Sequence, residues 1–302
     1  MGGIAFVFSG QGDQYPGMGK ELVQKYPAAA SVYEMCDSLR PGTSLQCFGG
    51  TEEELRETVN TQPCLFAMEL SAALVLLQQG ARPLAVAGFS LGEMVAATVS
   101  GILSPETGFR LVCRRGELMQ LAADRQDTSM AAVVKLTARE VEELCGRYSA
   151  VYPVNYNCPG QITVSGLSAQ MGDFCADVKK AGGRAIPLKV KGGFHSPFME
   201  EAAEAFREEL ERVDIREGRT VLYSNVTGMP YGEDVRELLS RQICSPVQWE
   251  RLIRNMADGG IDTFVEIGPG RTLTNMIRKI DNNVKALTVT EYLEGIYPDA
   301  NL

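Results

Sequence analysis

The fold expected for this chain follows from one stretch, Pro83 to Ala97, which reads P-L-A-V-A-G-F-S-L-G-E-M-V-A-A. Its first part is a short apolar run typical of a buried strand, and its last part consists of helix formers. Between them, Gly88-Phe89-Ser90-Leu91-Gly92 matches G-x-S-x-G, in which the two glycines leave room for a tight, strained turn. The stretch therefore predicts strand, sharp turn and helix, with the Ser90 hydroxyl at a helix N-terminus. The alternative is a glycine-flanked serine in an ordinary strand-to-helix turn.

The chain contains a single histidine, His195. A serine nucleophile needs a base that accepts its proton near neutral pH, and the ordinary pKa of histidine suits that task. The residues around His195, from Lys191 to Met199, are typical of a turn between a strand and a helix, where catalytic groups are common. Ser90 and His195 are therefore the candidate catalytic pair. The alternative is that this lone histidine is structural.

Composition limits the classes of function. With 302 residues, 45% apolar residues and 22% charged residues, the chain is typical of a globular protein with a substantial core. Its net charge of −9 argues against nucleic acid or an anionic membrane as a partner. Eight irregularly spaced cysteines and one histidine indicate neither a metal site nor a disulfide framework, so we expect reduced thiols and a cytoplasmic location without a signal peptide.

The order of the apolar runs predicts an α/β fold in two parts. Residues 1–127 and 192–302 are expected to form a large α/β-hydrolase-like domain with a parallel sheet. Residues 128–191 follow the order βαββαβ, which is typical of a ferredoxin-like subdomain. Because the chain returns to the large domain through His195, both candidate catalytic residues would lie where the two parts meet, a common place for binding sites.

Several local patterns give further expectations. The loop after the first strand, Ser9 to Gly17, does not match G-x-G-x-x-G, but at the carboxyl end of a central strand it can meet an anion or carbonyl. Thr51-Glu52-Glu53-Glu54 is a capping box that predicts a helix through Asn60. Gln62-Pro63 is expected to open an apolar helix to about Gln79, and the tail past about Thr290 is expected to be loosely packed.

Eight short motifs, in order, resemble the malonyl-CoA:acyl carrier protein transacylase family, which includes the acyltransferase domains of fatty acid and polyketide synthases. The likeness spans nearly the whole chain. The motifs are F-S-G-Q-G-D-Q (Phe8 to Gln14), T-Q-P (Thr61 to Pro63), G-F-S-L-G-E (Gly88 to Glu93), R-G-E-L-M-Q (Arg115 to Gln120), N-Y-N-C-P-G-Q (Asn155 to Gln161), F-H-S-P-F-M (Phe194 to Met199), S-P-V-Q-W (Ser245 to Trp249) and E-I-G-P-G (Glu266 to Gly270).

The resemblance implies a ping-pong reaction. A malonyl group would pass from malonyl-CoA to Ser90 and then to the phosphopantetheine thiol of acyl carrier protein, with His195 as the base. Backbone N–H groups of Gln11 and Leu91 would form the oxyanion hole. A backbone carbonyl near Gln248 would orient the histidine in place of a carboxylate.

The resemblance also implies a set of substrate-binding residues. Arg115 would hold the malonyl carboxylate, since a planar guanidinium matches a carboxylate through two hydrogen bonds. Gln62 would position this arginine. The other residues implied in this way are Met119, Asn155 and Asn157 along the thioester channel, and Phe194, which is typical of malonyl-selective members. No metal or redox cofactor is implied, and family members usually act as monomers.

Three positions depart from the family pattern. Ser9 replaces a proline, Asp13 replaces a serine, and Phe89 replaces the histidine that normally precedes the nucleophile. Phe89 changes the pocket wall beside Ser90 and leaves His195 without a second imidazole nearby. Two other functions remain open from the sequence: a thioesterase or esterase, which would have no use for Arg115, and a non-catalytic module that binds carrier protein. The pathway, fatty acid or polyketide synthesis, is not distinguished.

Carrier proteins are acidic, and so is this chain, so the resemblance implies a local basic patch. The alternative for each candidate is a scattered, solvated surface charge. The candidates are Lys179, Lys180, Arg184, Lys189 and Lys191, or Arg278 and Lys279.

Overall fold

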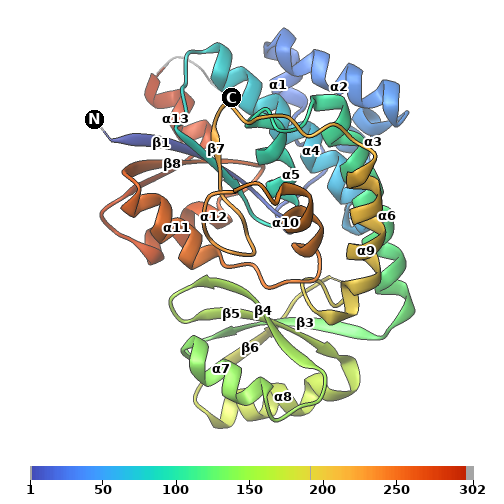
Figure 1. Ribbon diagram of the computed structural model, residues 1–302, viewed down its shortest axis with the longest axis vertical. Coiled ribbons are helices and arrows are strands. Elements are labelled where there is room, and N and C mark those ends of the chain that lie inside the picture. The colour runs from blue at the N-terminus through green and yellow to red at the C-terminus, as the bar shows by residue number, and fades with distance from the viewer. Residues whose placement is uncertain (1, 191, 297–302) are drawn as a thin grey trace.

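A computed structural model describes residues 2–190 and 192–296 and contains two separate sheets (Figure 1). The larger sheet has five strands, and all of its pairings are parallel. In spatial order these strands are β7 (Val221–Leu222), β2 (Ala85–Gly88), β1 (Gly3–Phe8), β8 (Ile261–Ile267) and β9 (Lys285–Thr288). The expected α/β class with a parallel sheet is confirmed.

Helices cover both faces of the parallel sheet. In chain order the helical elements of this part are α1 (Lys20–Lys25), α2 (Pro27–Leu39), α3 (Thr43–Gly49), the 3-10 turn η1 (Glu54–Arg56), α4 (Thr58–Gln78), α5 (Leu91–Val99), α6 (Pro105–Arg125), the 3-10 turn η2 (Pro197–Met199), α9 (Glu200–Glu211), α10 (Val235–Arg241), α11 (Trp249–Asp258), α12 (Thr272–Ile280) and α13 (Val289–Ile296).

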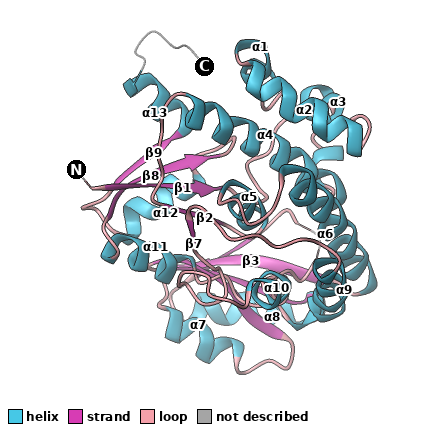
Figure 2. Cartoon of the chain, turned by 45° about the horizontal axis from the view of Figure 1, so that its top comes forward, coloured by secondary structure: helices cyan, strands magenta, loops and turns pink. Residues whose placement is uncertain are grey.

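The central strand β1 shows how the core is divided. Side chains alternate along a strand, so Phe6 and Phe8 pack with α4 and α5, whereas Ala5 and Val7 pack with α11 and α12. Figure 2 shows α4 on one side of β1 and β8 and α12 on the other. Burial on both faces explains why β1 is a continuous apolar run, as is usual for parallel sheets.

The second sheet is antiparallel and lies below the parallel sheet in Figure 1. The expected order βαββαβ is found between residues 128 and 187. Its elements are β3 (Thr128–Val134), α7 (Ala138–Cys145), β4 (Val151–Cys158), β5 (Gln161–Leu167), α8 (Ser168–Lys180) and β6 (Arg184–Pro187). The spatial order is β4-β5-β3-β6. Helices α7 and α8 lie on the side away from the parallel sheet, so the other face of this sheet is turned toward the parallel one (Figure 1).

Helix α4 is long and apolar enough, by length and composition, to cross a membrane. However, 83% of its most apolar 18-residue segment is buried inside the fold. Most of its residues contribute to the core that also holds Phe6 and Phe8. The hydropathy of α4 is therefore that of a core helix.

Three local expectations are wrong. The Thr51 capping box forms, with Glu54 N–H donating to Thr51 Oγ1 at 3.1 Å, but it starts only the 3-10 turn η1. That turn ends because Glu57 is extended (φ −68°, ψ 125°), and the chain begins a new helix at Thr58 rather than at Gln62-Pro63. The tail past Thr290 is helix α13 as far as Ile296, with Leu293 buried; residues 297–302 lie outside the described part.

Candidate active site

The nucleophile elbow has the geometry that G-x-S-x-G predicts. Ser90 connects β2 to α5 with φ 54° and ψ −106°, a conformation that is strained for a residue with a side chain. A Cβ on Gly88 would lie 1.8 Å from the carbonyl carbon of Gly92, and a Cβ on Gly92 would lie 2.3 Å from the Phe8 carbonyl oxygen. The two glycines are thus required by close backbone contacts, and the turn presents the Ser90 hydroxyl.

Ser90 and His195 lie in direct contact. The Ser90 Oγ is 2.7 Å from His195 Nε2, and His195 Nδ1 is 2.8 Å from the backbone carbonyl oxygen of Gln242. A carbonyl only accepts, so Nδ1 carries the proton and Nε2 is free to accept from the serine hydroxyl. His195 also has a positive φ, 60°, so both members of the pair sit on strained backbone.

The expectation that a carbonyl near Gln248 orients the histidine is wrong. Gln248 precedes α11, and its N–H donates to the Asn225 carbonyl at 2.8 Å. The His195 loop instead contacts the C-terminal end of α10, where the His195 N–H donates to the Ile243 carbonyl at 3.2 Å. The last carbonyls of a helix have no partner within the helix. The carbonyl of Gln242, the C-cap residue of α10, is therefore available to the imidazole.

Burial favours the neutral imidazole. His195 is 4% exposed, and burial together with the nearby positive charge of Arg115 lowers its pKa from 6.5 to about 4. The hydrogen bond to the Gln242 carbonyl acts in the opposite direction but is the weaker effect. At neutral pH the ring is thus unprotonated and able to take a proton.

Arg115 extends from α6 to the nucleophile and is fully buried. Its Nη2 donates to Ser90 Oγ at 3.2 Å and to Gln242 Oε1 at 2.8 Å, and its Nη1 donates to Gln62 Oε1 at 2.8 Å. Burial lowers the pKa of Arg115 to about 10, so the guanidinium stays charged at neutral pH. Its Nε has no partner among the described residues. A buried cation with an unused donor beside a nucleophile is suited to an anionic substrate group.

Two residues without a sequence-based role hold this arrangement together. Gln242 contacts all three reactive groups, because its carbonyl accepts from His195, its Oε1 accepts from Arg115 and its Nε2 donates to the Ser90 carbonyl at 2.5 Å. Asn225 fixes the elbow from the other side, accepting the Ser90 N–H at 2.8 Å and donating to the Gly88 carbonyl at 2.6 Å. Both residues are buried. Because each lies more than 130 residues from Ser90, no local sequence pattern indicates its role.

Behind Asn225 lies a buried carboxyl group on α5. Glu93 Oε1 accepts from the Asn225 N–H at 2.9 Å and from the Tyr231 hydroxyl at 2.7 Å. Burial raises the pKa of Glu93 to about 7, although the Tyr231 hydrogen bond opposes the shift. The glutamate of the G-F-S-L-G-E motif thus supports the elbow through Asn225. Among the described residues, it forms no hydrogen bond with the Ser90 hydroxyl.

The two residues expected to supply the oxyanion hole, Gln11 and Leu91, lie in the loop and at the helix start where the sequence predicts them. Gln11 is in the loop after β1, and Leu91 is the first residue of α5, next to Ser90. Within residues 2–190 and 192–296, neither backbone N–H donates to an acceptor. The Gln11 side chain is held by Gln62, whose Nε2 donates to Gln11 Oε1 at 3.3 Å and also approaches Met119 Sδ at 3.4 Å.

A small cavity of about 80 Å³ lies over the serine. It brings together most of the expected site residues. Its lining consists of Gln11, Phe89, Ser90, Met119, Met130, Asn155, Leu188, Val190, Phe194 and His195. Gln62, Leu91 and Arg115 adjoin it through the contacts described above, whereas Asn157 does not line it.

Asn157 lines a second cavity of about 240 Å³, together with Asn155, Gln11 and Phe89. It lies between the loop after β1, the antiparallel sheet and the start of α12. Asn157 Nδ2 donates to Thr163 Oγ1 at 3.1 Å. The side-chain oxygens of Asn155 and Asn157 are buried and have no partner among the described residues. Gln11, Phe89 and Asn155 also line the cavity over Ser90, so the two cavities adjoin.

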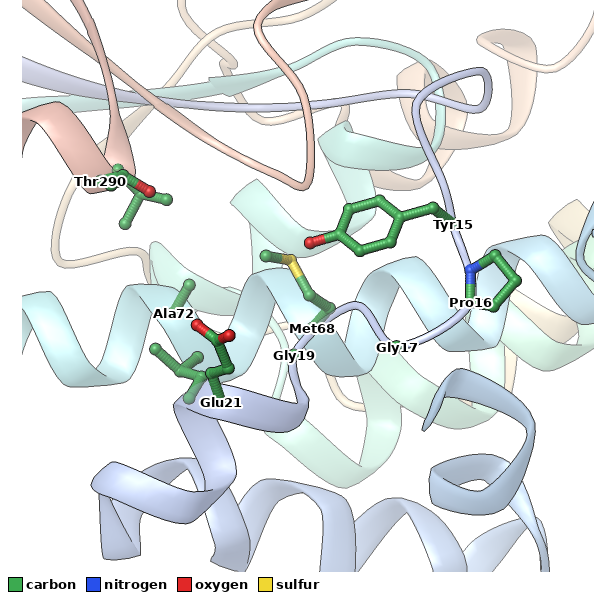
Figure 3. Close-up of a pocket in the computed structure, with 10 residues that line it drawn as sticks. Tyr15, Pro16, Gly17, Gly19, Glu21, Met68, Ala72 and Thr290 are labelled. Atoms are coloured by element: carbon green, nitrogen blue, oxygen red, sulfur yellow. The ribbon is translucent and has the colours of Figure 1, made fainter. Parts of the chain in front are cut away.

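Another cavity, of about 380 Å³, shares no lining residue with the one over Ser90. It lies between the loop after β1, α1, α4 and the start of α13. Figure 3 shows Tyr15, Met68 and Thr290 around it, with Glu21 on α1. None of the expected site residues lines this cavity.

The three residues that depart from the family pattern, Phe89, Asp13 and Ser9, all contact residues near the candidate active site or in the core. Phe89 lines both cavities near the serine and packs edge-on against Trp249, with ring centroids 5.5 Å apart. Asp13 lies beside Gly270, where an added Cβ would be 2.2 Å from its Oδ2. Ser9 is buried and bonds to Glu69 on α4.

Several of the candidate basic residues already have partners within the fold. Lys180 pairs with Asp177 at 2.7 Å, and Arg278 donates to the Ala286 carbonyl at 2.8 Å. Lys189 lines a cavity of about 430 Å³ next to Gln11, with Arg56 on its edge. Lys191 lies outside the described residues.

Comparisons with known proteins agree with this geometry. The model of a family described as acyl transferase domain matches residues 5–296. The chain is 36% identical over 300 residues to the malonyl CoA-acyl carrier protein transacylase of Bacillus subtilis, covering 96% of this chain and 94% of that protein.

Solved structures show the same likeness. The acyl-carrier-protein S-malonyltransferase of Bartonella henselae superposes with a TM-score of 0.93 at 35% identity, covering 98% of each chain. A malonyl-transacylase solved in complex with its type II polyketide synthase acyl-carrier protein superposes with a TM-score of 0.92 at 31% identity, covering 95% of each chain.

Proposed function

This chain belongs to the malonyl CoA-acyl carrier protein transacylase family and transfers malonyl groups for fatty acid or polyketide synthesis, and we propose that it does so through a malonyl-Ser90 intermediate. The observation that carries the proposal is the contact of the Ser90 hydroxyl with the neutral His195 on one side and the buried Arg115 cation on the other. Ser90 and His195 form a nucleophile with its base. Arg115 is a partner for a free carboxylate on the substrate.

In the first half-reaction, His195 Nε2 takes the proton of Ser90 as Oγ attacks the thioester carbonyl of malonyl-CoA. The N–H groups of Gln11 and Leu91 donate hydrogen bonds to the carbonyl oxygen, on which negative charge develops. His195 then gives its proton to the departing CoA thiolate. The product of this half-reaction is the malonyl-Ser90 ester. The Gln242 carbonyl keeps the ring in the required tautomer throughout.

In the second half-reaction, the phosphopantetheine thiol of acyl carrier protein loses its proton to His195 and attacks the malonyl ester. The proton returns to Ser90 Oγ as the new thioester leaves. All bonds that form and break are acyl and proton transfers, so we propose that no metal or redox cofactor takes part.

We propose that Arg115 holds the malonyl carboxylate during both steps. Hydrogen bonds to Gln62 and Gln242 fix the position of the guanidinium. Its Nη2 contacts Ser90, and its Nε has no hydrogen-bond partner among the described residues. The thioester arm would lie along Asn155 and Asn157, which line the cavity next to the one over Ser90. Lys189, at the cavity beside Gln11, is the candidate contact for the acidic carrier protein.

The test is intact-protein mass spectrometry after brief incubation with malonyl-CoA, followed by addition of holo acyl carrier protein. We expect a malonyl adduct on the enzyme that disappears as malonyl carrier protein forms. Steady hydrolysis without carrier protein would favour a thioesterase or esterase. Absence of an adduct with malonyl-CoA, acetyl-CoA and methylmalonyl-CoA would favour a non-catalytic carrier-binding module.

The low pKa of His195 predicts an unusual pH profile. The base must be neutral, so activity falls as the pH approaches the folded-state pKa of about 4 rather than the ordinary value of 6.5. We expect kcat/KM for malonyl-CoA to stay constant from pH 8 to about pH 5. NMR titration of the imidazole measures this pKa directly, because the chain has one histidine. A midpoint near 6.5 in both measurements would contradict the effect of burial.

We also propose the finer organisation of the chain. Residues 1–127 and 192–302 form an α/β-hydrolase-like domain, supported by the parallel sheet and the strained serine elbow. Residues 128–191 form a ferredoxin-like subdomain, supported by the order β4-β5-β3-β6 with all neighbours antiparallel. A monomer in the cytoplasm is the state we propose for the working enzyme.

A further inference from the structure

The loop that carries Gln11 is attached to the core by an unusual contact. Ser9, where the family pattern has proline, is 2% exposed, and its Oγ donates to Glu69 Oε1 at 2.5 Å. Glu69 lies in the middle of α4 and is completely buried. Its second oxygen, Oε2, has no partner among the described residues. A buried carboxyl group with a single side-chain partner is costly, so its location needs an explanation.

Helix α4 contacts the same loop at a second point. Gln62 Nε2 donates to Gln11 Oε1 at 3.3 Å, two residues beyond Ser9. Residues seven apart on a helix lie two turns apart on one face, so Gln62 and Glu69 present both contacts from the same side of α4. The helix therefore holds the loop at each end of the segment Ser9-Gly10-Gln11.

The rest of the loop is confined by backbone contacts. A Cβ on Gly92 would lie 2.6 Å from the Ser9 carbonyl oxygen, and a Cβ on Gly10 would lie 2.9 Å from the Phe89 carbonyl oxygen. On the other side, a Cβ on Gly268 would lie 2.4 Å from Ser9 Oγ. The loop is thus enclosed by the nucleophile elbow and the turn after β8. Gln11 lies two residues after Ser9 in this confined segment.

The surroundings of Glu69 favour the neutral form of its carboxyl group. Burial raises its pKa well above the ordinary value, and the negative charge of Glu266 on β8 adds to the shift, while the Ser9 hydrogen bond opposes it. Glu266 itself accepts the backbone N–H groups of Leu273 and Thr274 at the start of α12, at 3.0 and 2.7 Å. Burial also raises the pKa of Glu266, but this carboxyl group has two backbone donors, whereas Glu69 has the Ser9 hydroxyl.

We propose that Glu69 is a positioning residue for the oxyanion hole, which acts through Ser9 to fix the backbone N–H of Gln11. This inference rests on the proposed role of that N–H in the reaction. The charge on the substrate carbonyl develops mainly in the transition state. Loss of the Ser9–Glu69 contact therefore affects the acylation step more than the binding of malonyl-CoA.

The test compares Ser9→Ala and Glu69→Gln with the control Ser71→Ala. Ser71 is also buried on α4, but its Oγ bonds, among the described residues, to the main-chain carbonyls of Ala67 and Ala29. The measurements are the single-turnover rate of malonyl-enzyme formation, the KM for malonyl-CoA and the melting temperature of each variant. They separate an effect on catalysis from an effect on folding.

We expect Ser9→Ala to slow acylation about tenfold with KM nearly unchanged, because a small displacement of an oxyanion donor is costly. Glu69→Gln keeps an acceptor for Ser9 and should retain most of the rate, whereas Ser71→Ala should leave the rate unchanged. The inference is overturned if Ser9→Ala acylates at the wild-type rate, or if Ser71→Ala slows the reaction equally. If the wild-type protein forms no malonyl adduct, the proposed function fails instead.

Discussion

Ser90→Ala is expected to abolish the malonyl adduct and to lower the transfer of malonyl groups to carrier protein by about 10⁴-fold or more. The reaction passes through a covalent ester, and alanine has no atom that can form it. The imidazole, the oxyanion donors and Arg115 remain in place, but their effects depend on the nucleophile. Intact-protein mass spectrometry after incubation with malonyl-CoA measures the adduct, and a thiol-release assay measures the turnover.

The matched control is Ser100→Ala. Ser100 is buried at the C-terminal end of the same helix, α5, and its hydroxyl bonds to the Ala97 carbonyl at 2.8 Å. This variant should keep the adduct and the turnover, even if its melting temperature falls. A malonyl adduct of undiminished yield on Ser90→Ala would show that another residue is the nucleophile, and peptide mapping would locate it.

Local patterns predicted the nucleophile because some of its requirements are local. Gly88 is required by the backbone of Gly92, within two residues of Ser90, so the spacing indicates the turn; Gly92 is required by the distant Phe8 and Ser9 backbone, which the spacing does not reveal. His195 could be chosen as the base because the chain has one histidine. The role of Arg115 could be predicted only from the family likeness, because the sequence does not show whether a guanidinium is buried or exposed.

The residues that sequence reasoning missed act across the fold. Gln242 and Asn225 reach the elbow from α10 and from the segment after β7, and their roles exist only once those elements pack. The expectation places the orienting carbonyl near Gln248, within the S-P-V-Q-W motif, whereas it belongs to Gln242, just before that motif. Only the end of α10 decides which carbonyl is available.

The errors in secondary structure have local causes too. The capping box at Thr51 is real, but a capped start does not ensure that a helix continues, and here Glu57 interrupts it. The last helix, α13, has a comparable signal in Thr288 and Glu291, whose side chains bond to each other's backbone N–H groups at 3.2 and 2.8 Å. Loose packing is the usual expectation for a chain end, but here these hydrogen bonds cap a helix.

Arg115→Ala is expected to lower kcat/KM for malonyl-CoA by at least about 100-fold, the equivalent of about 3 kcal/mol, because two charge-assisted hydrogen bonds to the carboxylate are lost. Acetyl-CoA has no carboxylate, and in the wild-type site it would leave the buried guanidinium without an anion. Arg115→Ala should therefore react with acetyl-CoA at least as well as the wild type does, and the selectivity should shift toward acetyl.

The control for Arg115→Ala is Arg114→Ala, one residue earlier on α6. The Arg114 side chain is 42% exposed and pairs with Glu117 and Glu209 at the surface, so its removal should leave the selectivity unchanged. Competition between malonyl-CoA and acetyl-CoA, read by mass spectrometry of the acylated enzyme, measures both variants. Equal losses of malonyl and acetyl transfer in Arg115→Ala would mean that the guanidinium supports Ser90 and Gln242 structurally. A selective loss of malonyl transfer would mean that it recognises the carboxylate, since only the substrate anion distinguishes the two thioesters.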